Sequence, residues 1–435
     1  MSASDTAFVT SNRPLPSLWA ATAPAGPDTP PLSESTRTDV LVIGGGYTGL
    51  STALHLAEAG TQVTVLEAHE PGWGASGRNG GQVNPTVKHD PDELVRLLGP
   101  DKAEPLISAV SGSADLVFGL IERHRIDCAP VRKGWLQVAY APEAVAGMHA
   151  RAAQWQQRGV EVELLDAGAT ARRMGTPVFA GGWRDGRAGG LQPLAYARGL
   201  ARAALAHGAR IHGQTRVTGL RRADGRWVAS TALGHSVTAE RVVIGTNGYT
   251  DALWPGLAQT VLAANSFIVA TEPLGERGRG ILEDGLTAST SQRLLLYLRR
   301  DAQGRLLLGG RGNFGDPRDA SDFAHLQRSL ALLYPKLAGV RLDYHWAGRV
   351  AITMDAMPHV HEPAPGVSIA LGYNGRGVAL ASSMGMHLAR RLTDSTYRFP
   401  FLVSAIRPIP MHGLQRFYIA AGVLWYSLLD RVARR

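Results

Sequence analysis

The chain reads DVLVIGGGYTGLSTALHLAEAGTQVTVLE from residue 39 to residue 67. Residues 39–43 form a short apolar, β-branched run, which predicts a buried parallel strand. Residues 50–59 have the composition of a helix and are followed by a glycine that suits its end. Residues 61–66 predict a second strand, which Glu67 closes. The segment therefore predicts a βαβ unit with an acidic residue at the end of its second strand.

The turn after the first strand carries a G-x-G-x-x-G motif. Its residues are Gly44, Gly45, Gly46, Tyr47, Thr48 and Gly49. Gly44 permits a tight turn, Gly46 lets the backbone approach a pyrophosphate, and Gly49 lets the helix pack close to the sheet. The helix N-terminus offers free N–H groups to phosphates, and Glu67 can accept hydrogen bonds from ribose hydroxyls. These features predict a dinucleotide site, disfavour NADP because Glu67 would repel a 2′-phosphate, and do not separate FAD from NAD.

Composition narrows the class of protein. The 435 residues suggest two or three domains, and 45% hydrophobic with 19% charged residues indicate a globular chain. The net charge is +9, but no basic run is interleaved with aromatic residues, so nucleic-acid binding is not expected. Cys128 is the only cysteine, which excludes an intramolecular disulfide and fits a reducing compartment.

The two ends of the chain differ in character. Residues 1–36 are rich in Pro, Ser and Thr, lack the pattern of a signal peptide and predict an extended arm, with Trp19 as a candidate anchor. Residues 414–432 are rich in aromatic and aliphatic side chains with basic flanks. This tail is compatible with an interfacial membrane helix, although a helix packed on the body or on a partner is favoured.

Three later segments contain glycine-rich turns. Residues 74–82, GASGRNGGQ, could wrap a flat ligand, with Arg78 near phosphate charge, or could form a flexible loop. Residues 241–248, RVVIGTNG, predict a strand that ends in a polar turn. Residues 367–377 repeat this pattern before a predicted helix, whose N-terminus could face a second electron-rich group.

Together these motifs resemble the D-amino-acid-oxidase-like superfamily of FAD-dependent oxidoreductases, and within it most closely the gamma-glutamylputrescine oxidoreductase branch. The resemblance covers nearly the whole chain. It depends on the motifs at residues 44–49, 77–82, 246–248, 297–310, 346–355 and 372–377.

The resemblance implies an α/β fold in which a Rossmann-like FAD-binding domain, of the glutathione-reductase type, is interleaved with an α+β substrate domain built on an antiparallel sheet. The FAD-binding domain would comprise residues 37–90, 180–252 and 345–395, and the substrate domain residues 91–179 and 253–344. The arm would comprise residues 1–36 and a helical tail residues 396–435.

The resemblance also implies the residues that bind FAD. They are Gly44, Gly46, Tyr47, Thr48, Gly49, Glu67, Arg78, Asn79, Gly80, Gly81, Gln82, Val217, Thr246, Gly248, Gly375, Arg376 and Gly377. Val217 would contact adenine through its backbone, and the turn at 375–377 would present N–H groups to the flavin pyrimidine edge. Some relatives attach the flavin through a histidine at the position of Gln82, so FAD is expected to bind here non-covalently.

The function implied is oxidation of a C–N bond in an amine or amino acid, similar to gamma-glutamylputrescine. Hydride would pass to flavin N5, and water would hydrolyse the resulting imine, with Tyr297 and Arg299 as candidate active-site residues and no metal. Some oxidases of the superfamily activate O2 with a lysine near the flavin. No lysine lies between Lys133 and Lys336, which argues against a fast reaction with O2 and leaves a quinone or another acceptor open. The alternatives are a membrane-associated dehydrogenase and a non-catalytic flavin-binding subunit. The expected location is the cytoplasm, with the inner face of the membrane as the alternative.

Overall fold

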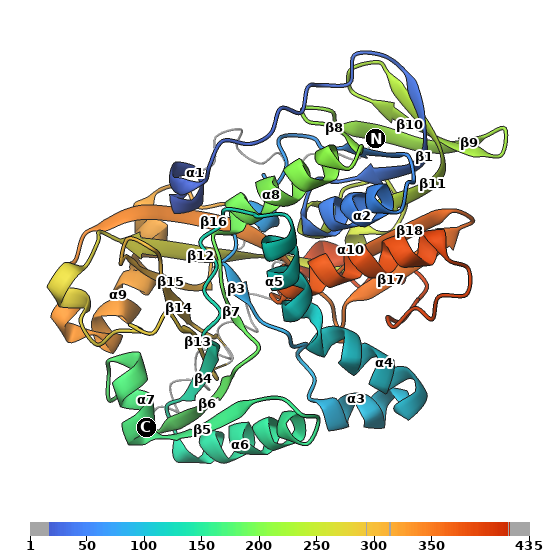
Figure 1. Cartoon of the computed structure of the whole chain (residues 1–435). Helices are drawn as coiled ribbons and strands as arrows, with labels where there is room; N and C mark the ends of the chain where they lie inside the picture. Colours follow the sequence, from blue (N-terminus) through green and yellow to red (C-terminus); the bar gives the residue numbers. More distant parts are fainter. Residues whose placement is uncertain (1–16, 293, 313–314, 416, 418–435) are drawn as a thin grey trace.

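The structure is a computed structural model that describes residues 17–292, 294–312, 315–415 and 417. Within these residues, two large sheets lie side by side, and helices cover them (Figure 1). Residues 396–411 contain no helix and are followed by the short 3-10 helix η7 (His412–Leu414), so the helical tail predicted from residue 396 is wrong in this stretch. The proposed membrane helix at 414–432 falls largely outside the described residues. The expected combination of a Rossmann-like domain with a mainly antiparallel second sheet is confirmed.

The first sheet has the strand order β17-β18-β11-β1-β2-β8. Its strands are β17 (His359–Ala364), β18 (Val367–Leu371), β11 (Ser236–Ile244), β1 (Thr36–Ile43), β2 (Val63–Leu66) and β8 (Arg210–His212). The four strands β18, β11, β1 and β2 are joined by parallel pairings, and β1 pairs with β11 on one side and β2 on the other. The antiparallel hairpin of β9 (Val217–Ala223) and β10 (Arg226–Thr231) extends from β11.

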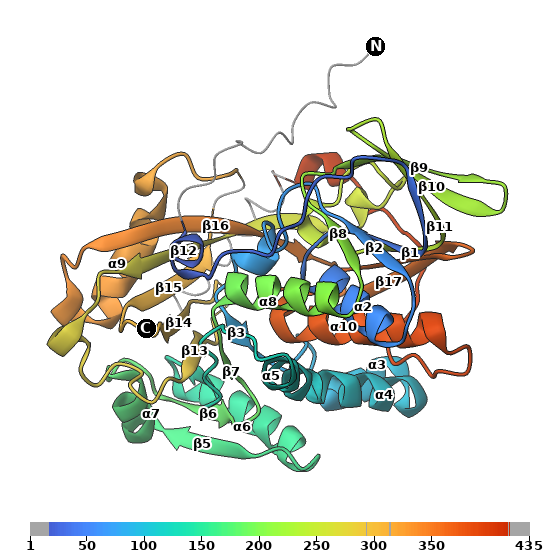
Figure 2. The ribbon, with the colours of Figure 1, turned by 45° about the horizontal axis from the view of Figure 1, so that its top comes forward.

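The predicted βαβ unit is present as β1, α2 (Tyr47–Glu58) and β2. Helix α2 packs between α8 (Pro193–Ala206) and α10 (Gly377–Thr393), and these helices cover one face of the sheet (Figures 1 and 2). A core that includes Val40, Leu50 and Leu54 fills the space beneath them. Because both faces of β1 are buried, its four last residues, 40–43, are all apolar.

The second sheet has the strand order β16-β12-β15-β14-β13-β4-β6-β5. Its strands are β16 (Leu342–Ile352), β12 (Leu262–Thr271), β15 (Leu306–Arg311), β14 (Tyr297–Arg300), β13 (Thr287–Thr290), β4 (Trp135–Ala139), β6 (Gly181–Asp185) and β5 (Val162–Asp166). Pairing is antiparallel except between β13 and β4. Helices α6 (Pro142–Gln156), α7 (Ala167–Met174) and α9 (Ala324–Leu333) pack against it, and the strands β3 (Gln82–Val83) and β7 (Gly189–Gly190) form a small separate pair.

Sheet membership places some segments differently from the predicted domain boundaries. Strand β6 and most of β16 were assigned to the FAD-binding domain, but β6 pairs with β4 and β5 and β16 pairs with β12. Helices α3 (Pro91–Leu98), α4 (Pro100–Ser111) and α5 (Ser113–Arg123) were assigned to the substrate domain, yet α4 and α5 pack on α10. Local sequence patterns do not reveal these pairings because they join segments that are far apart in the chain.

The N-terminal arm is not extended throughout, because α1 (Leu18–Thr22) interrupts it. Trp19 in this helix is 1% exposed and packs edge-on against Trp346 with ring centroids 5.8 Å apart. The predicted anchoring of the arm by Trp19 is confirmed.

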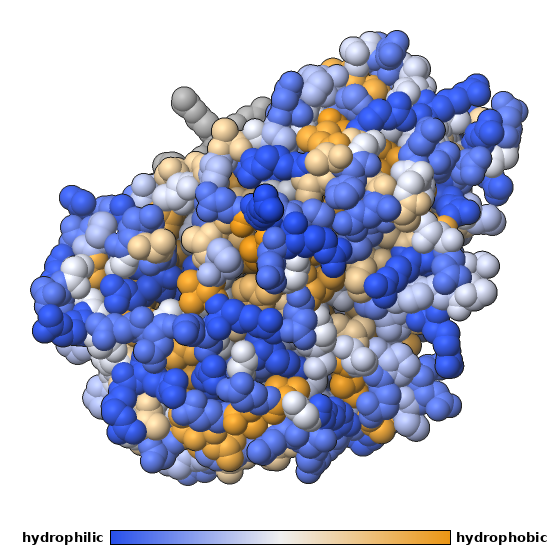
Figure 3. All heavy atoms as spheres, in the orientation of Figure 1, coloured by the Kyte–Doolittle hydropathy of each residue, from blue (hydrophilic) through white to orange (hydrophobic). Residues whose placement is uncertain are grey.

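By length and composition, the helical region Pro100–Arg123 could cross a membrane. It consists of α4 and α5, and 44% of its apolar window is buried inside the fold, as in the core helices of many globular proteins. On the face of the molecule drawn in Figure 3, hydrophilic residues are spread between smaller apolar groups. The peripheral membrane contact remains a prediction.

Candidate functional site

A cavity of 1420 Å³ lies where β1, β11 and β18 end and the second sheet begins. Ligands of parallel α/β sheets bind beyond the carboxyl ends of the strands, at the point where strand order reverses. Of the residues predicted from the sequence, those that line this cavity are Gly44, Gly46, Tyr47, Thr48, Glu67, Arg78, Asn79, Gly80, Gln82, Val217, Thr246, Gly248, Tyr297, Gly375, Arg376 and Gly377. Its volume exceeds the 300–1,000 Å³ or so of a typical ligand pocket, which leaves room for a large cofactor together with a substrate.

The N-terminus of α2 forms one wall of the cavity. A Cβ atom on Gly46 would lie 2.9 Å from Ser76 Oγ, and the Tyr47 N–H donates a 3.0 Å hydrogen bond to that same oxygen. Gly49 lies on the far side of the turn, where a Cβ would come within 2.0 Å of the Gly44 carbonyl oxygen. The first turn of α2 has no acidic side chain, so its N-terminal charge is available to an anion.

Glu67 occupies the position predicted for the ribose-binding carboxylate. Its two oxygens accept hydrogen bonds from the Gly45 N–H at 2.6 Å and the His69 N–H at 3.0 Å, which fix the carboxylate at the end of β2. Burial raises the pKa of Glu67, while these backbone donors oppose that effect. A buried carboxylate held at the cavity wall suits hydroxyl donors of a ribose.

The loop at residues 74–82 is held by hydrogen bonds of its own, as expected for a loop that wraps a ligand. Asn79 organises it: Nδ2 donates to the carbonyl oxygens of Ala75 (3.1 Å) and Ser76 (2.9 Å), and Oδ1 accepts from the Gly81 N–H at 2.7 Å. The Arg78 guanidinium stacks 4.3 Å from the Trp73 ring centroid. The loop is therefore preorganised along the cavity.

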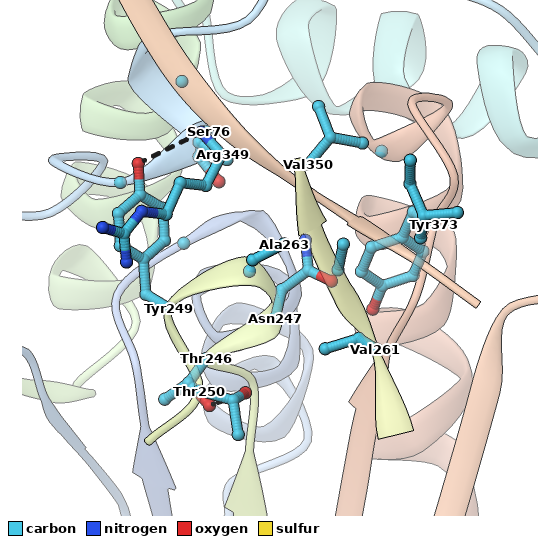
Figure 4. Close-up of a pocket in the computed structure, with 18 of the residues that line it drawn as sticks. Ser76, Thr246, Asn247, Tyr249, Thr250, Val261, Ala263, Arg349, Val350 and Tyr373 are labelled. Carbon is cyan, nitrogen blue, oxygen red and sulfur yellow. Dashed lines mark hydrogen bonds between the residues drawn. The ribbon is translucent and has the colours of Figure 1, made fainter. Parts of the chain in front are cut away.

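The two later glycine turns meet each other and α2. Asn247 Oδ1 accepts a 2.9 Å hydrogen bond from the Gly372 N–H, which joins the turns after β11 and β18. The hydroxyls of Tyr373 and Thr48 lie 2.6 Å apart, which connects the second turn to α2. Figure 4 shows Asn247 between Tyr373 on one side and Tyr249 with Arg349 on the other. Segments separated by more than 300 residues thus complete one cavity.

Tyr297 and Arg299 were both predicted to act at the active site, but they lie in different surroundings. Tyr297 lines the cavity, and its hydroxyl lies 2.8 Å from Ser266 Oγ. Burial raises the Tyr297 pKa, so the hydroxyl stays protonated. Arg299 is 6% exposed and does not line the cavity; its guanidinium donates to the carbonyl oxygens of Gly81 and Leu191.

This placement differs from the prediction that Arg299 contacts substrate or flavin. Side chains alternate across a strand, but Tyr297 and Arg299 share a face of β14, so alternation alone does not explain the difference. The Arg299 guanidinium reaches behind Gly81, where a Cβ atom would lie 2.3 Å from its Nη1. Gly81 and Gly49 likewise do not line the cavity and support its wall from behind.

The sequence analysis missed Lys88 as a site residue. Lys88 lines the cavity and is exposed to solvent, although protein atoms crowd around its side chain. Desolvation by these atoms, with Arg376 and Arg151 as neighbouring cations, lowers the Lys88 pKa to about 8. The lysine follows Gln82 by six residues, so its nearness in sequence to the glycine-rich loop was the available signal.

The features of the cavity fit a flavin dinucleotide: a helix N-terminus for the pyrophosphate, Glu67 for a ribose, and a continuous wall that extends from there to Tyr297. Residues 39–391 match the FAD dependent oxidoreductase family (DAO), and the chain belongs to this family. It is therefore an FAD-dependent oxidoreductase.

Individual relatives agree with this membership. The probable oxidoreductase OrdL of Rhizobium meliloti is 35% identical over 422 residues, which cover 95% of this chain and 97% of that protein. The gamma-glutamylputrescine oxidoreductase of Escherichia coli is 35% identical over 407 residues, which cover 92% of this chain and 95% of that protein. The solved structure of glycine oxidase from Geobacillus kaustophilus has a TM-score of 0.70 at 23% identity and covers 83% of this chain and 96% of that one. The last likeness concerns the fold alone.

Proposed function

We propose that this enzyme oxidises a C–N bond of an amine or amino acid that also carries a carboxylate, with gamma-glutamyl amines as the substrate class. Family membership supports flavin-dependent oxidation, and the relatives named for gamma-glutamylputrescine and glycine support nitrogen substrates. The requirement for a carboxylate rests on the charges in the cavity.

The observation that carries the proposal is the pair of cations on the cavity wall, Lys88 and Arg376. Neither side chain forms an ion pair or a hydrogen bond with any residue that the structure describes. The Arg376 guanidinium lies 4.8 Å from the Trp135 ring centroid, and burial lowers its pKa to about 10. The Asp185 carboxylate raises the Arg376 pKa but forms its ion pair with Arg187, and two cations on one cavity wall favour an anionic group on the ligand.

The chain's own residues would divide the work as follows. FAD, when bound, supplies the acceptor for a hydride, which carries both electrons of the oxidation. The N-terminus of α2 and the 74–82 loop would hold its pyrophosphate, and the turn at 375–377 would present N–H groups that stabilise negative charge on the reduced ring. Tyr297 closes the wall as a neutral hydroxyl held by Ser266. Gln82 offers no nucleophile to the flavin, so FAD is bound non-covalently.

The test is anaerobic bleaching of the yellow protein with matched substrates. Gamma-glutamylputrescine is expected to reduce the flavin, and putrescine, which lacks the carboxylate, is expected to do so at least tenfold less efficiently in kcat/KM. Glycine and N-methyl amino acids test shorter carboxylated substrates. Equal rates for putrescine and its gamma-glutamyl derivative would remove the carboxylate from the proposal, and failure of every amine to reduce bound FAD would support a non-catalytic flavin-binding subunit.

The electron acceptor separates an oxidase from a dehydrogenase. The argument against O2 rested on the lack of a lysine within residues 134–335. The structure places another lysine, Lys88, on the cavity wall. Oxygen consumption with peroxide formation during turnover would identify an oxidase. Turnover only with a dye or quinone would favour the dehydrogenase.

A further inference from the structure

Three helices end beside one another on the body of the first domain. Glu58 is the last residue of α2, His124 directly follows α5, and His207 directly follows α8. Helix α2 packs against α8 along its length (Figure 2). The three side chains come from positions that are 66 and 83 residues apart in sequence, so no metal-binding spacing is visible in the chain.

The ligand atoms of these side chains all lie within 4.8 Å of one another. Glu58 Oε1 is 3.3 Å from His124 Nε2 and 4.0 Å from His207 Nε2. Tetrahedral Zn²⁺ with bonds of about 2.0–2.1 Å requires neighbouring ligand atoms about 3.3–3.4 Å apart. One edge already has this length, and the His207 side chain is 43% exposed, with its ring edge-on to the His124 ring at a centroid distance of 5.6 Å.

His124 indicates that the cluster lacks a ligand. Its side chain is only 9% exposed, and Nε2 is buried without a hydrogen-bond partner among the described residues. A buried polar atom without a partner costs free energy, and native proteins leave few of them. This nitrogen lies 3.3 Å from Glu58 Oε1, which pairs with the ring only when the ring is protonated, so Nε2 is aimed into the cluster.

The local charges favour a cation. The C-terminal ends of α2, α5 and α8 each bring partial negative charge, and Glu58 adds a carboxylate at the end of a helix where an anion is unfavourable. Arg123 Nη1 lies 3.8 Å from Glu58 Oε1, but the Arg123 side chain is 62% exposed.

We infer that Glu58, His124 and His207 form a binding site for a divalent transition metal ion, best matched by Zn²⁺. Two imidazoles and one carboxylate are a zinc ligand set, and the exposed side leaves the fourth position to water. None of the three residues lines the flavin cavity, so the ion would not take part in hydride transfer. It would tie together three helix ends, including the end of α2 opposite the pyrophosphate.

Isothermal titration of the FAD-loaded protein with ZnCl2 tests this inference. The protein should carry no polyhistidine tag and should first be treated with a chelator. One Zn²⁺ per chain should bind, and the thermal midpoint should rise with Zn²⁺ concentration, because an ion that binds only the folded state stabilises it. Substituting Co²⁺ should give the absorption bands of a tetrahedral site.

Variants connect the binding to these side chains. His207→Ala, at the most exposed ligand, and Glu58→Gln should each weaken Zn²⁺ binding at least tenfold while flavin content stays unchanged. His235→Ala, in the turn between β10 and β11, is the matched control and should bind as the wild type does. Absence of stoichiometric binding in the wild type, or wild-type affinity in His207→Ala, would overturn the inference and leave the cluster as an ion pair between Glu58 and its basic neighbours.

Discussion

The indole N–H of Trp19 donates a 2.8 Å hydrogen bond to the carbonyl oxygen of Asn79. This contact fastens the N-terminal helix α1 to the residue that organises the 74–82 loop. Trp346 from β16 donates to the neighbouring carbonyl of Arg78 at 3.0 Å, so two indoles from distant segments hold consecutive residues of one loop. The arm is thus part of the cofactor site rather than an appendage.

Replacing Trp19 should loosen this loop. Trp19→Ala removes the hydrogen bond and the edge-on contact with Trp346, and it should lower the free energy of unfolding by ~3–5 kcal/mol. Trp19→Phe keeps an aromatic ring and should cost about 1–2 kcal/mol. Chemical denaturation and the fraction of FAD retained after gel filtration measure both effects. Full retention of FAD by a destabilised Trp19→Ala protein would separate the arm from the cofactor site.

Gly49 should tolerate no side chain. A Cβ there would lie 2.0 Å from the Gly44 carbonyl oxygen, which belongs to the turn around the pyrophosphate, so Gly49→Ala should weaken FAD binding at least tenfold. Gly119 in α5 has no atom within 4 Å of its Cβ position. Gly119→Ala is therefore a matched control, expected to stabilise the protein by about 0.5–1 kcal/mol. Fluorescence titration of apoprotein with FAD compares the two, and equal affinities would contradict the packing argument.

The charge on Lys88 predicts the pH dependence of substrate binding. The Lys88 pKa is lowered to about 8, so the ammonium is present below that pH and lost above it. If it binds the substrate carboxylate, kcat/KM for a gamma-glutamyl amine should fall relative to Lys88→Arg as the pH rises through about 8. The arginine of the variant stays charged over this pH range. The ratio of kcat/KM between wild type and Lys88→Arg is therefore independent of the titration of the substrate amine.

Lys88→Met should raise KM for the carboxylated amine roughly tenfold or more, as expected for the loss of a hydrogen bond to a charged group. It should leave KM for putrescine nearly unchanged. A similar rise in KM for both substrates would show that Lys88 does not read the carboxylate.

Arg299 is expected to act through the loop and not on the substrate. Arg299→Met removes the side-chain donor to the carbonyl oxygens of Gly81 and Leu191, of which Gly81 keeps the 2.8 Å bond from the Leu191 N–H, and it should weaken FAD binding about tenfold. The KM for substrate in the FAD-saturated enzyme should stay within twofold of wild type. If instead Arg299→Met raises KM only for carboxylated substrates, the sequence-based assignment of Arg299 to the substrate was right.

If FAD is bound non-covalently, denaturing the protein should release it. Gln82 lies on the cavity wall, and its Nε2 donates to the carbonyl oxygens of Ala288 and Leu298 at 3.1 and 3.2 Å. An amide cannot form the bond that a histidine forms with a flavin. Acid precipitation should therefore leave the yellow colour in the supernatant, and a yellow pellet would contradict the prediction.

How much of the site could be predicted depends on how local its parts are. The βαβ unit, Glu67 and the glycine turns could be predicted because each depends on a short segment of sequence. The strands show in their apolar runs, the turns in their glycines, and the helix in the residues that begin it. Lys88 was not visible because it lies outside the motifs. Arg299 lies in the motif at 297–310, but the motif does not show whether its side chain faces the cavity or the back of the loop. The domain boundaries failed at β6 and β16 for the same reason, because strand pairing joins distant segments.

By itself, the sequence determined that a dinucleotide is held at a helix N-terminus, because glycine spacing and a strand-ending carboxylate act within about 30 residues of one another. Only the tertiary structure decided which charged side chains face the cavity and which stand behind it. It also decided that Glu58, His124 and His207 meet at all. Both depend on the packing of helices and the pairing of strands far apart in the chain, and no local pattern encodes that geometry.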